Sequence, residues 1–491
     1  MSRRLCNAVL DDLPAGCRRP AYDRGALKAG IVHLGVGAFH RAHQAVYTDD
    51  AIEAAGGNWG TVGISLRSST AATQLNPQDG LFCVGSRDGD RESLRAIGNI
   101  KTVITAPEDP AAALAALTDA DIGLVTLTIT EKGYCIDPAS GELLADHEDL
   151  RHAHDPSLAP DSAIGYLVEA IRLRRQAGAA PLTLVSCDNL PANGARLHSA
   201  LVQYAAVSDE ALARFIETDI ACPQTMIDRI VPATTCGDLD RIEAALGYRD
   251  AGYVKTEPFS QWVIEDRFSG PVPGWDRAGA MLVAAVGPFE TAKLRLLNGP
   301  HSTIAYLGYL AGFEYVHEVM ARPELRRCIT ELMEREILPA VDPPPGLDLD
   351  AYARDLRNRF ENRALEHRTW QIAMDGSQKL PQRLLDTIRR RIREGRRYDR
   401  LALAVAAWMI YATGKDLDGK AIDVRDPLAE RTAALGRTAN GSAPRLVEGF
   451  LGLTDVFGED LSANREFRTA LEARATTLLA RGVLAAVEEL S

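Results

Sequence analysis

Three residues within a nine-residue stretch carry side chains suited to proton transfer. Lys293, Asn298 and His301 lie five and three positions apart in the segment KLRLLNGPH. On a continuous helix they would sit at about 0°, about 140° and about 80° around the axis, broadly on one face. Gly299-Pro300 is expected instead to break the helix, which makes Asn298 an N-cap and places Pro300 in the first turn. Either arrangement can bring an amine, an amide and an imidazole to one pocket.

The chemistry that such a set serves is the interconversion of an alcohol and a ketone. A dehydrogenase needs a base for the alcohol proton and donors for the oxygen on which charge develops. Taken alone, the spacing equally fits a surface lysine, a capping asparagine and a core histidine.

Polar residues also follow two segments that are typical of parallel strands. Asn189 comes after the apolar stretch 182–186, and Glu131 ends the β-branched stretch 123–130. Active sites of open α/β sheets lie beyond the carboxyl ends of the strands, so both residues are placed for a catalytic role. An ordinary turn residue is the alternative for Asn189.

A glycine-rich turn between a predicted strand and a predicted helix indicates a dinucleotide site. The apolar run 30–37 ends in glycines and precedes an alanine-rich helical stretch, 41–55. The first glycine permits a tight turn, and the second lets backbone N–H groups approach a pyrophosphate. The usual third glycine is absent, with His40 in its place. The cofactor-binding residues predicted here are Gly35, Val36, Gly37, Ala38 and Phe39.

The end of the second predicted strand bears on the choice of nicotinamide cofactor. NAD sites usually carry an Asp or Glu there for the ribose 2′-hydroxyl. This chain has Arg67, Ser68 and Ser69 followed by Thr70, with no acid before Asp79. Hydroxyls and an arginine also tolerate a 2′-phosphate, so these residues leave both NAD and NADP open.

The elements that must position these residues change character near residue 285. Before it, strands (30–37, 60–66, 123–130, 182–186) alternate with helices (41–55, 164–177), which predicts an α/β domain with a parallel sheet. After it, apolar residues recur at helical spacing over 284–312, 314–338, 349–363, 381–394, 399–413 and 465–490. We therefore predict a Rossmann-type dinucleotide-binding domain over residues 1–285 and a mostly α-helical domain over 286–491.

Composition excludes several classes of protein. The 491 residues are 46% hydrophobic and 25% charged, as in folded globular proteins, with a net charge of −12. An acidic chain lacks the basic face that nucleic acid requires, and the uncharged stretch 296–313 contains too many polar groups for a membrane span. Eight scattered cysteines without a C-x-x-C pair, and an N-terminus without an apolar signal core, favour a reduced, cytoplasmic protein.

Six segments of the chain resemble the polyol-specific long-chain dehydrogenases, which include mannitol 2-dehydrogenases and fructuronate reductases. They are GIVHLGVGAFHRAHQ, TLTITEKGYC, SCDNLPANG, DRIVPAT, EPFSQWVIED and KLRLLNGPHSTIAYLGYL. The resemblance runs from about residue 30 to beyond residue 450, and Lys-x4-Asn-x2-His is specific to the family. It implies a Rossmann-type domain, a helical domain with the active site between the two, no metal, and a monomer or small homo-oligomer.

The resemblance also implies roles for individual residues. Lys293 matches the catalytic general base, Asn189 and Asn298 match the oxyanion-hole amides, and His301 matches the imidazole that orients the substrate. Burial beside the cofactor would lower the pKa of this lysine. The positions that match contacts to substrate hydroxyls are Asp228 and Lys379. As a hypothesis, Glu290, one helical turn before Lys293, or Glu131 relays the released proton to water.

The segment HRTWQIAMDGSQKLPQR, residues 367–383, resembles the fructuronate reductase branch more than the mannitol branch. The expected reaction is reduction of D-fructuronate to D-mannonate, with NAD placed before NADP. A uronate carries a carboxylate, which calls for one more cation; the candidates are Arg383, Arg368 and Lys132. The alternatives are a mannitol or arabinitol dehydrogenase and, remotely, a dinucleotide-binding sensor without catalytic activity.

Overall fold

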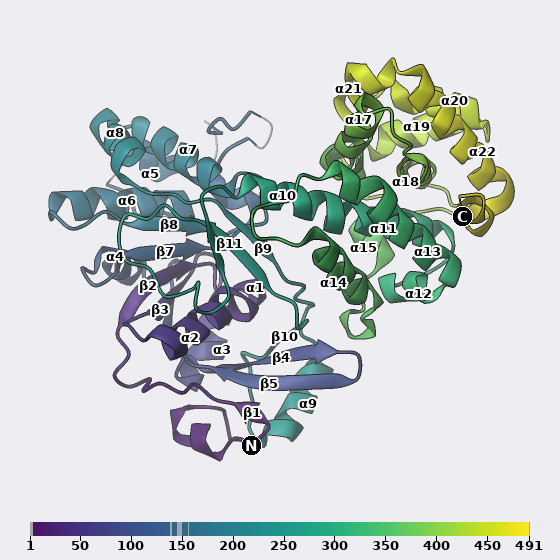
Figure 1. Cartoon of the computed structure of the whole chain (residues 1–491). Coiled ribbons are helices and arrows are strands. Elements are labelled where there is room, and N and C mark those ends of the chain that lie inside the picture. The colour runs from purple at the N-terminus through teal and green to yellow at the C-terminus, as the bar shows by residue number, and fades with distance from the viewer. Residues whose placement is uncertain (1–2, 138–139, 145–149, 156, 491) are drawn as a thin grey trace. The chain divides into compact units, whose positions relative to one another are not determined.

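The computed structural model describes residues 3–137, 140–144, 150–155 and 157–490, and it divides into two compact units (Figure 1). The first unit comprises Met1–Gly287 and the second Pro288–Ser491. Each unit encloses buried apolar side chains of its own.

A five-stranded parallel sheet forms the centre of the first unit. Its strands, in spatial order, are β6 (Ile100–Thr105), β3 (Gly60–Ser65), β2 (Ala29–Leu34), β7 (Leu124–Leu127) and β8 (Thr183–Ser186). Every neighbouring pair is parallel. The chain runs from β2 outward to β3 and β6 and then returns to β7 on the other side of β2. In such sheets the ligand crevice lies at this reversal, outside the carboxyl ends of the strands.

Both faces of the sheet are covered, because parallel strands are apolar on both sides. On one face, α4 (Pro110–Thr118), α6 (Ala163–Gln176) and α7 (Asn193–Ala206) bury aliphatic side chains against Val32 and Val125. On the other, α2 (Gln44–Ala55) packs Tyr47 near Ile31 (Figure 1). The α/β class predicted from the alternating pattern is therefore confirmed.

The apolar pattern does not predict the two smaller sheets of this unit. One contains β1 (Cys17–Arg18), β5 (Arg91–Ile97), β4 (Phe82–Asp88) and β10 (Val254–Thr256). The other contains β12 (Met281–Val283), β11 (Gln261–Glu265) and β9 (Thr225–Asp228). Strands β1, β9, β10 and β12 have two to four residues, which is too few to show alternation. Strands β4 and β5 have seven residues each, but each is buried at one end and not at alternate positions. The remaining helices are α1 (Ala38–Ala42), α3 (Thr70–Leu75), α5 (Arg151–His154), α8 (Glu210–Asp219) and α9 (Cys236–Leu246).

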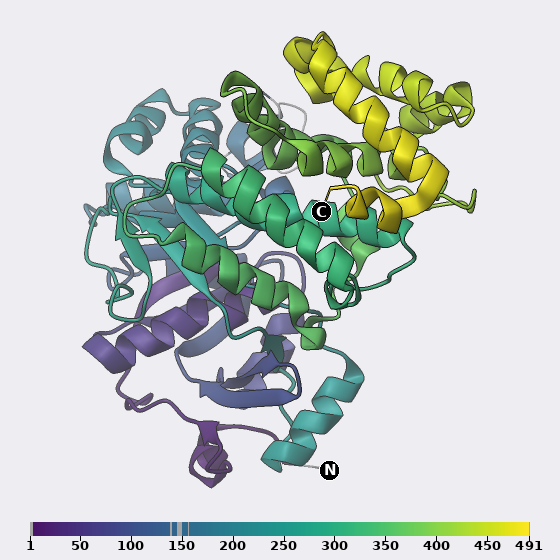
Figure 2. The same ribbon diagram turned by 45° about the vertical axis from the view of Figure 1, so that its right-hand side comes forward.

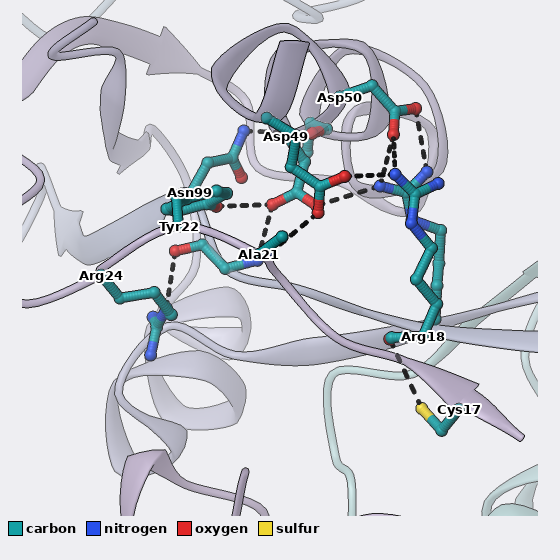
Figure 3. Close-up of polar contacts among 12 residues, drawn as sticks. Cys17, Arg18, Ala21, Tyr22, Arg24, Asp49, Asp50 and Asn99 are labelled. Atoms are coloured by element: carbon teal, nitrogen blue, oxygen red, sulfur yellow. Dashed lines mark hydrogen bonds and ion pairs between the residues drawn. The ribbon is translucent and has the colours of Figure 1, made fainter. Parts of the chain in front are cut away.

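The helix predicted over 41–55 is two helices, α1 and α2, separated by His43 with φ −123° and ψ −85°. An N-terminal segment is tied to α2, as Figure 3 shows. Tyr22 donates its hydroxyl hydrogen to Asp49 at 2.6 Å, and Arg18 donates to Asp50 at 3.0 Å. Through these contacts the N-terminal segment helps to fix α2, the longer of the two helices that follow the glycine-rich turn.

The second unit is built from helices, as the pattern beyond residue 285 predicts. They are α10 (Gly287–Lys293), α11 (Gly299–Leu310), α12 (Val316–Ala321), α13 (Pro323–Glu331), α14 (Leu349–Glu361), α15 (Thr369–Ala373), α16 (Gly376–Leu380), α17 (Asp386–Arg393), α18 (Asp399–Ala412), α19 (Ala429–Ala439), α20 (Ala443–Leu451), α21 (Thr454–Ser462) and α22 (Arg465–Glu488). Three π-helical segments lie among them: Leu294–Asn298, Leu332–Ile337 and Pro381–Leu385.

Helix α18 is the core of this unit, because all of its residues from Arg400 to Ala412 are buried. A helix that is apolar all round is expected at the centre of a bundle. The long helix α22, drawn in yellow in Figure 2, packs against α18 and bends at Gly482, where φ is 78°. Within the described residues, no helix combines the length and apolar character needed to cross a membrane.

Candidate active site

A cavity of about 750 Å³ opens in the first unit at the carboxyl ends of β2, β3 and β7. This is the reversal point at which doubly wound sheets bind nucleotides. Of the residues predicted to hold a cofactor, those that line it are Gly35, Val36, Gly37, Arg67 and Ser68. Ala38, Phe39 and Ser69 are not among the described residues that line it.

Two glycines shape the turn that forms one wall of this cavity. Gly35 has φ 92°, and a Cβ there would lie 2.1 Å from the carbonyl oxygen of Thr128, so only glycine fits. Gly37 has φ −84°, and its Cβ would meet only the Gly35 carbonyl oxygen, at 3.9 Å. A side chain at position 37 would therefore occupy cavity space. With glycine, a pyrophosphate can approach the backbone, and the turn fits a dinucleotide.

His33, in the middle of β2, braces this turn and was not singled out by sequence reasoning. One ring nitrogen, Nδ1, lies 2.7 Å from Thr126 Oγ1, and Nε2 lies 3.1 Å from the Gly35 carbonyl oxygen. Because a carbonyl oxygen only accepts, Nε2 carries the proton. Burial lowers the pKa of His33 to about 3, so the ring is neutral. The only sequence signal was a histidine inside an apolar strand.

A second cavity of about 310 Å³ shares Leu66 and Asp161 with the first. The loop after β6 contributes Ala106, Pro107 and Pro110 to its walls. These apolar walls suit a flat aromatic ring, so the two cavities together offer a polar part and an apolar part, as a dinucleotide requires.

Near the residues shared by the two cavities lie the side chains that are expected to contact the ribose of the cofactor. Arg67, Ser68 and Thr70 line the larger cavity at the end of β3, and Asp161 is the only carboxylate among the described residues that line it. Asp161 Oδ2 lies 2.5 Å from the guanidinium of Arg151. Arg67 is exposed and forms no ion pair within the described residues. The structure thus places no free acid at the position typical of NAD sites.

Four other predicted residues of the first unit lie at or just after strand ends. Asn189 is exposed and follows β8 after Cys187 and Asp188. Glu131 is exposed at the start of a short 3₁₀ turn after β7, and Lys132 lines the larger cavity. Asp228 is buried at the end of β9, opposite Gln261 of β11. The first unit therefore supplies one amide and two carboxylates near its strand ends.

In the second unit, the Lys293–His301 segment lies in one continuous helix that contains a π turn. Asn298 has φ −74° and ψ −31° and makes no side-chain cap, so the prediction that it is an N-cap after a helix break is wrong. Gly299 N–H donates to Leu294 O, five residues back. Pro300 has no N–H, so it loses no bond where the register returns from five to four residues. A π turn holds more residues than an α turn, which reduces the angle between Lys293 and Asn298.

The polar groups on this helix are largely buried. Lys293 and His301 are each 8% exposed. Asn298 Oδ1 is buried and accepts no hydrogen bond within the described part of the chain. A buried amide oxygen without a donor is costly, so this atom suits a substrate hydroxyl or an ammonium group. Glu290, three residues before Lys293, is half-buried on the same helix.

Gly299 brings a second polar segment against this helix. A Cβ at Gly299 would lie 2.8 Å from the carbonyl oxygen of Arg383, so glycine permits the close approach. Arg383 donates to Ser302 Oγ at 3.1 Å and has no carboxylate partner among the described residues. Burial lowers the pKa of this guanidinium. Arg383 is therefore a half-buried cation with no carboxylate beside it in the described part of the chain.

His301 lies among aromatic rings and cations. Its ring stacks on Phe360, with centroids 5.3 Å apart, and meets His367 edge-on at 4.8 Å. Burial, followed by His367 and Arg383, holds the pKa of His301 well below its usual range, and burial lowers the pKa of His367 to about 4. Both imidazoles are neutral near pH 7, so His301 can exchange hydrogen bonds with a hydroxyl without adding charge.

The other predicted cations have partners. Lys379 donates to the carbonyl oxygen of Met374 at 2.6 Å, and burial lowers its pKa. Arg368 is exposed, pairs with Glu314 at 2.8 Å and lies over the ring of Tyr315. Within the described residues, no group of three or more His, Cys, Asp or Glu side chains could hold a metal ion.

Two family models match the chain. The mannitol dehydrogenase Rossmann domain matches residues 29–277, and the mannitol dehydrogenase C-terminal domain matches residues 285–479. D-mannonate oxidoreductase of Escherichia coli (strain K12) is 44% identical over 97% of this chain and 98% of its own length.

Solved structures agree with these matches. The ternary complex of Pseudomonas fluorescens mannitol 2-dehydrogenase with NAD and D-mannitol is 36% identical, covers 99% of both chains and superposes with a TM-score of 0.83. A substrate-free D-sorbitol dehydrogenase is 30% identical, covers 99% of this chain and 100% of its own, and gives a TM-score of 0.91.

Proposed function

Because the chain belongs to the mannitol dehydrogenase family of oxidoreductases, we propose that it interconverts D-fructuronate and D-mannonate with NAD as cofactor. The 44% identity to a D-mannonate oxidoreductase supports this substrate pair. The NAD in the solved mannitol 2-dehydrogenase, at 36% identity, supports the cofactor.

The observation that carries the choice of a sugar acid is the state of Arg383. It is half-buried, its one hydrogen bond among the described residues goes to Ser302, and no carboxylate there balances its charge. A substrate carboxylate would supply the missing counter-charge in a bidentate pair. Arg368 already pairs with Glu314, and Lys132 lines the nucleotide cavity. Arg383 is therefore the preferred partner of the three candidates.

Lys293 acts as the general acid and base in this proposal. In the direction of reduction, its ammonium group gives a proton to the ketone oxygen while the ketone carbon accepts a hydride. The bound cofactor supplies that hydride. In the direction of oxidation, the neutral amine takes the proton of the alcohol. Lys293 is buried, and a general base of this kind works best when its pKa lies near the operating pH.

The amides and the imidazole stabilise and orient the substrate. Asn189 and Asn298 donate N–H groups to the oxygen that gains charge. His301, held neutral by burial, and the side chains of Asp228 and Lys379 bond the remaining hydroxyls. Glu290 or Glu131 passes the proton between the lysine and water.

The residues that would hold NAD line the two cavities of the first unit. Gly35 and Gly37 leave room for the pyrophosphate, and the apolar walls at Pro107 and Pro110 take the adenine ring. Arg67, Ser68 and Thr70 meet the ribose, and they also accommodate a 2′-phosphate. Comparing kcat/KM for NADH and NADPH measures the preference directly.

The test follows the absorbance of NADH while the purified enzyme is given D-fructuronate or D-fructose. We expect turnover of fructuronate with a kcat/KM at least tenfold above that for fructose. Higher kcat/KM for fructose would reject the sugar-acid assignment and favour a mannitol 2-dehydrogenase, the activity named for the solved relative.

A further inference from the structure

A buried carboxylate behind the carboxyl edge of the sheet contacts the segment that follows the neighbouring strand. Asp188 comes two residues after β8 and is 7% exposed. Its Oδ1 accepts the backbone N–H of Thr130 at 2.8 Å, and its Oδ2 accepts the N–H of Ile129 at 3.1 Å. The hydroxyl of Tyr134 donates to Oδ2 at 2.7 Å. The carboxylate therefore links the end of β8 to the turn after β7.

That turn is strained at Thr130. Its φ of 64° and ψ of 166° lie in a region that is essentially reserved for glycine, and a β-branched side chain raises the cost. The side chain is exposed and forms no hydrogen bond within the described residues that would offset the strain. Asp188 thus accepts the N–H groups of both residues at this strained turn and helps to hold its conformation.

The strained turn sets the positions of the residues that follow it. Glu131 and Lys132 come directly after Thr130, and Gly133 N–H closes the turn by donating to Thr130 O at 3.0 Å. Ile129, Lys132 and Gly133 line the larger cavity. If the peptide at Thr130 relaxed, both the cavity wall and the direction of Glu131 would change.

We propose that Asp188 is a positioning residue, which holds the turn at Thr130 in its strained form and so places Glu131 and Lys132 for the reaction. The inference rests on the proposed function. Asp188 acts through the backbone of the turn and touches neither substrate nor cofactor in this role. A glycine at position 130 would adopt the same conformation without strain, so it would need the carboxylate less.

The test is a double-mutant cycle with Asp188→Asn and Thr130→Gly, measured as kcat and KM for fructuronate and NADH. We expect Asp188→Asn to lower kcat/KM about 10- to 100-fold, because small displacements of reacting groups have effects of that size. Thr130→Gly alone should stay within about threefold. In the double variant, kcat/KM should recover more than threefold over Asp188→Asn. Recovery of threefold or less, or an Asp188→Asn variant within threefold of the unaltered enzyme, overturns the proposal.

A matched control is available in Asp250, another buried carboxylate of the same unit. It accepts the N–H groups of Cys83 and Gly252 and one side-chain donor, Gln78. Asp250→Asn removes the same kind of bonds, but adding Thr130→Gly to this variant should not restore any lost kcat/KM. Recovery of Asp250→Asn by Thr130→Gly would show a general effect of the glycine and would reject the specific role of Asp188.

Two further measurements do not depend on turnover. If Asp188→Asn does not fold, hydrogen exchange in the unaltered enzyme tests the role of Asp188 instead. Slow exchange of the Ile129 and Thr130 amides supports the proposal, and exchange at the rate of an unprotected peptide overturns it. The affinity for NADH, measured by fluorescence for the same three variants, repeats the double-mutant cycle in the absence of sugar substrate. If fructuronate is not turned over, the proposed function fails, whereas the exchange result still decides the role of Asp188.

Discussion

The two units present their candidate functional residues in opposite ways. In the first unit the nucleotide cavity is shaped by the backbone, and Gly35 and Gly37 matter because they carry no side chain. In the second unit Lys293, Asn298 and His301 are predicted to act through the groups they carry, and they lie on one helix that contains a π turn. A site made of backbone depends on shape, whereas a site made of side chains depends on charge and proton transfer.

The largest expected effect tests the predicted role of the side chains in the second unit. Lys293→Ala removes the proposed general acid and base and should lower kcat by about 100- to 10,000-fold. The affinity for NADH should stay within about twofold, because the cavity lies in the first unit. Steady-state rates and NADH fluorescence titration measure the two quantities. A variant that keeps more than a tenth of the original kcat would contradict the role of Lys293.

Arg383→Gln should have the next largest effect, and it should depend on the substrate. Loss of a charge-assisted pair with a carboxylate should lower kcat/KM for fructuronate about 100-fold, with a much smaller effect on a neutral ketose. Arg368→Gln is the matched control, since Arg368 is exposed and already paired with Glu314. Equal losses for the acid and the neutral sugar would reject Arg383 as the carboxylate partner.

Both units should lose stability in acid, because each buries neutral imidazoles. The pKa of His33 falls to about 3 when the protein folds, so between about pH 6.5 and pH 3 the unfolded chain binds more protons. Stability therefore falls as the pH falls through 6.5, and His33 accounts for about 2 kcal/mol of the loss at pH 5.

Urea unfolding at pH 7.5 and pH 5 measures this loss in the unaltered protein and in His33→Leu. The variant should lose about 2 kcal/mol less between the two pH values. His367, with a pKa of about 4, is the counterpart in the second unit. An unchanged pH dependence in His33→Leu would mean that folding does not lower the pKa of this ring, so that His33 is protonated at pH 5 in the folded protein as well.

The smallest expected effect tests whether the backbone of the glycine-rich turn shapes the nucleotide cavity. Gly37→Ala adds a methyl group to the cavity without backbone strain, because φ is −84°. The KM for NADH should rise about tenfold, or ~1.4 kcal/mol, while kcat at saturating NADH stays within about twofold. Gly123→Ala is the control, because a Cβ there meets nothing within 4 Å. An unchanged KM for NADH would show that the pyrophosphate does not approach Gly37.

Sequence patterns predict the parts of this protein that repeat or carry unusual chemistry. The strands β2, β3, β7 and β8 are visible because buried parallel strands form apolar runs, and the segment around Lys293 is visible because reactive side chains occur at fixed spacing. The turn at Gly35 is visible only through its glycines. The roles predicted for individual site residues stay predictions.

Other features leave no local signal. The π turn at Leu294–Asn298 changes a hydrogen-bond register, which the apolar pattern does not report, so Asn298 is predicted as a cap and is instead inside a helix. His33 and Asp188 bond to segments about 60 to 100 residues away in the chain. Such partners become apparent only when the sheet brings neighbouring strand ends together.

The π turn also bears on how the length of this helix can vary. It accommodates one residue more than a regular helix would over the same rise. Deleting a single position between 294 and 298 would restore ordinary winding and leave the residues after it at nearly the same angle relative to Lys293. Protein engineers who recombine relatives here should therefore expect a difference of one residue to be absorbed at this turn, with the helical segments on either side keeping their register.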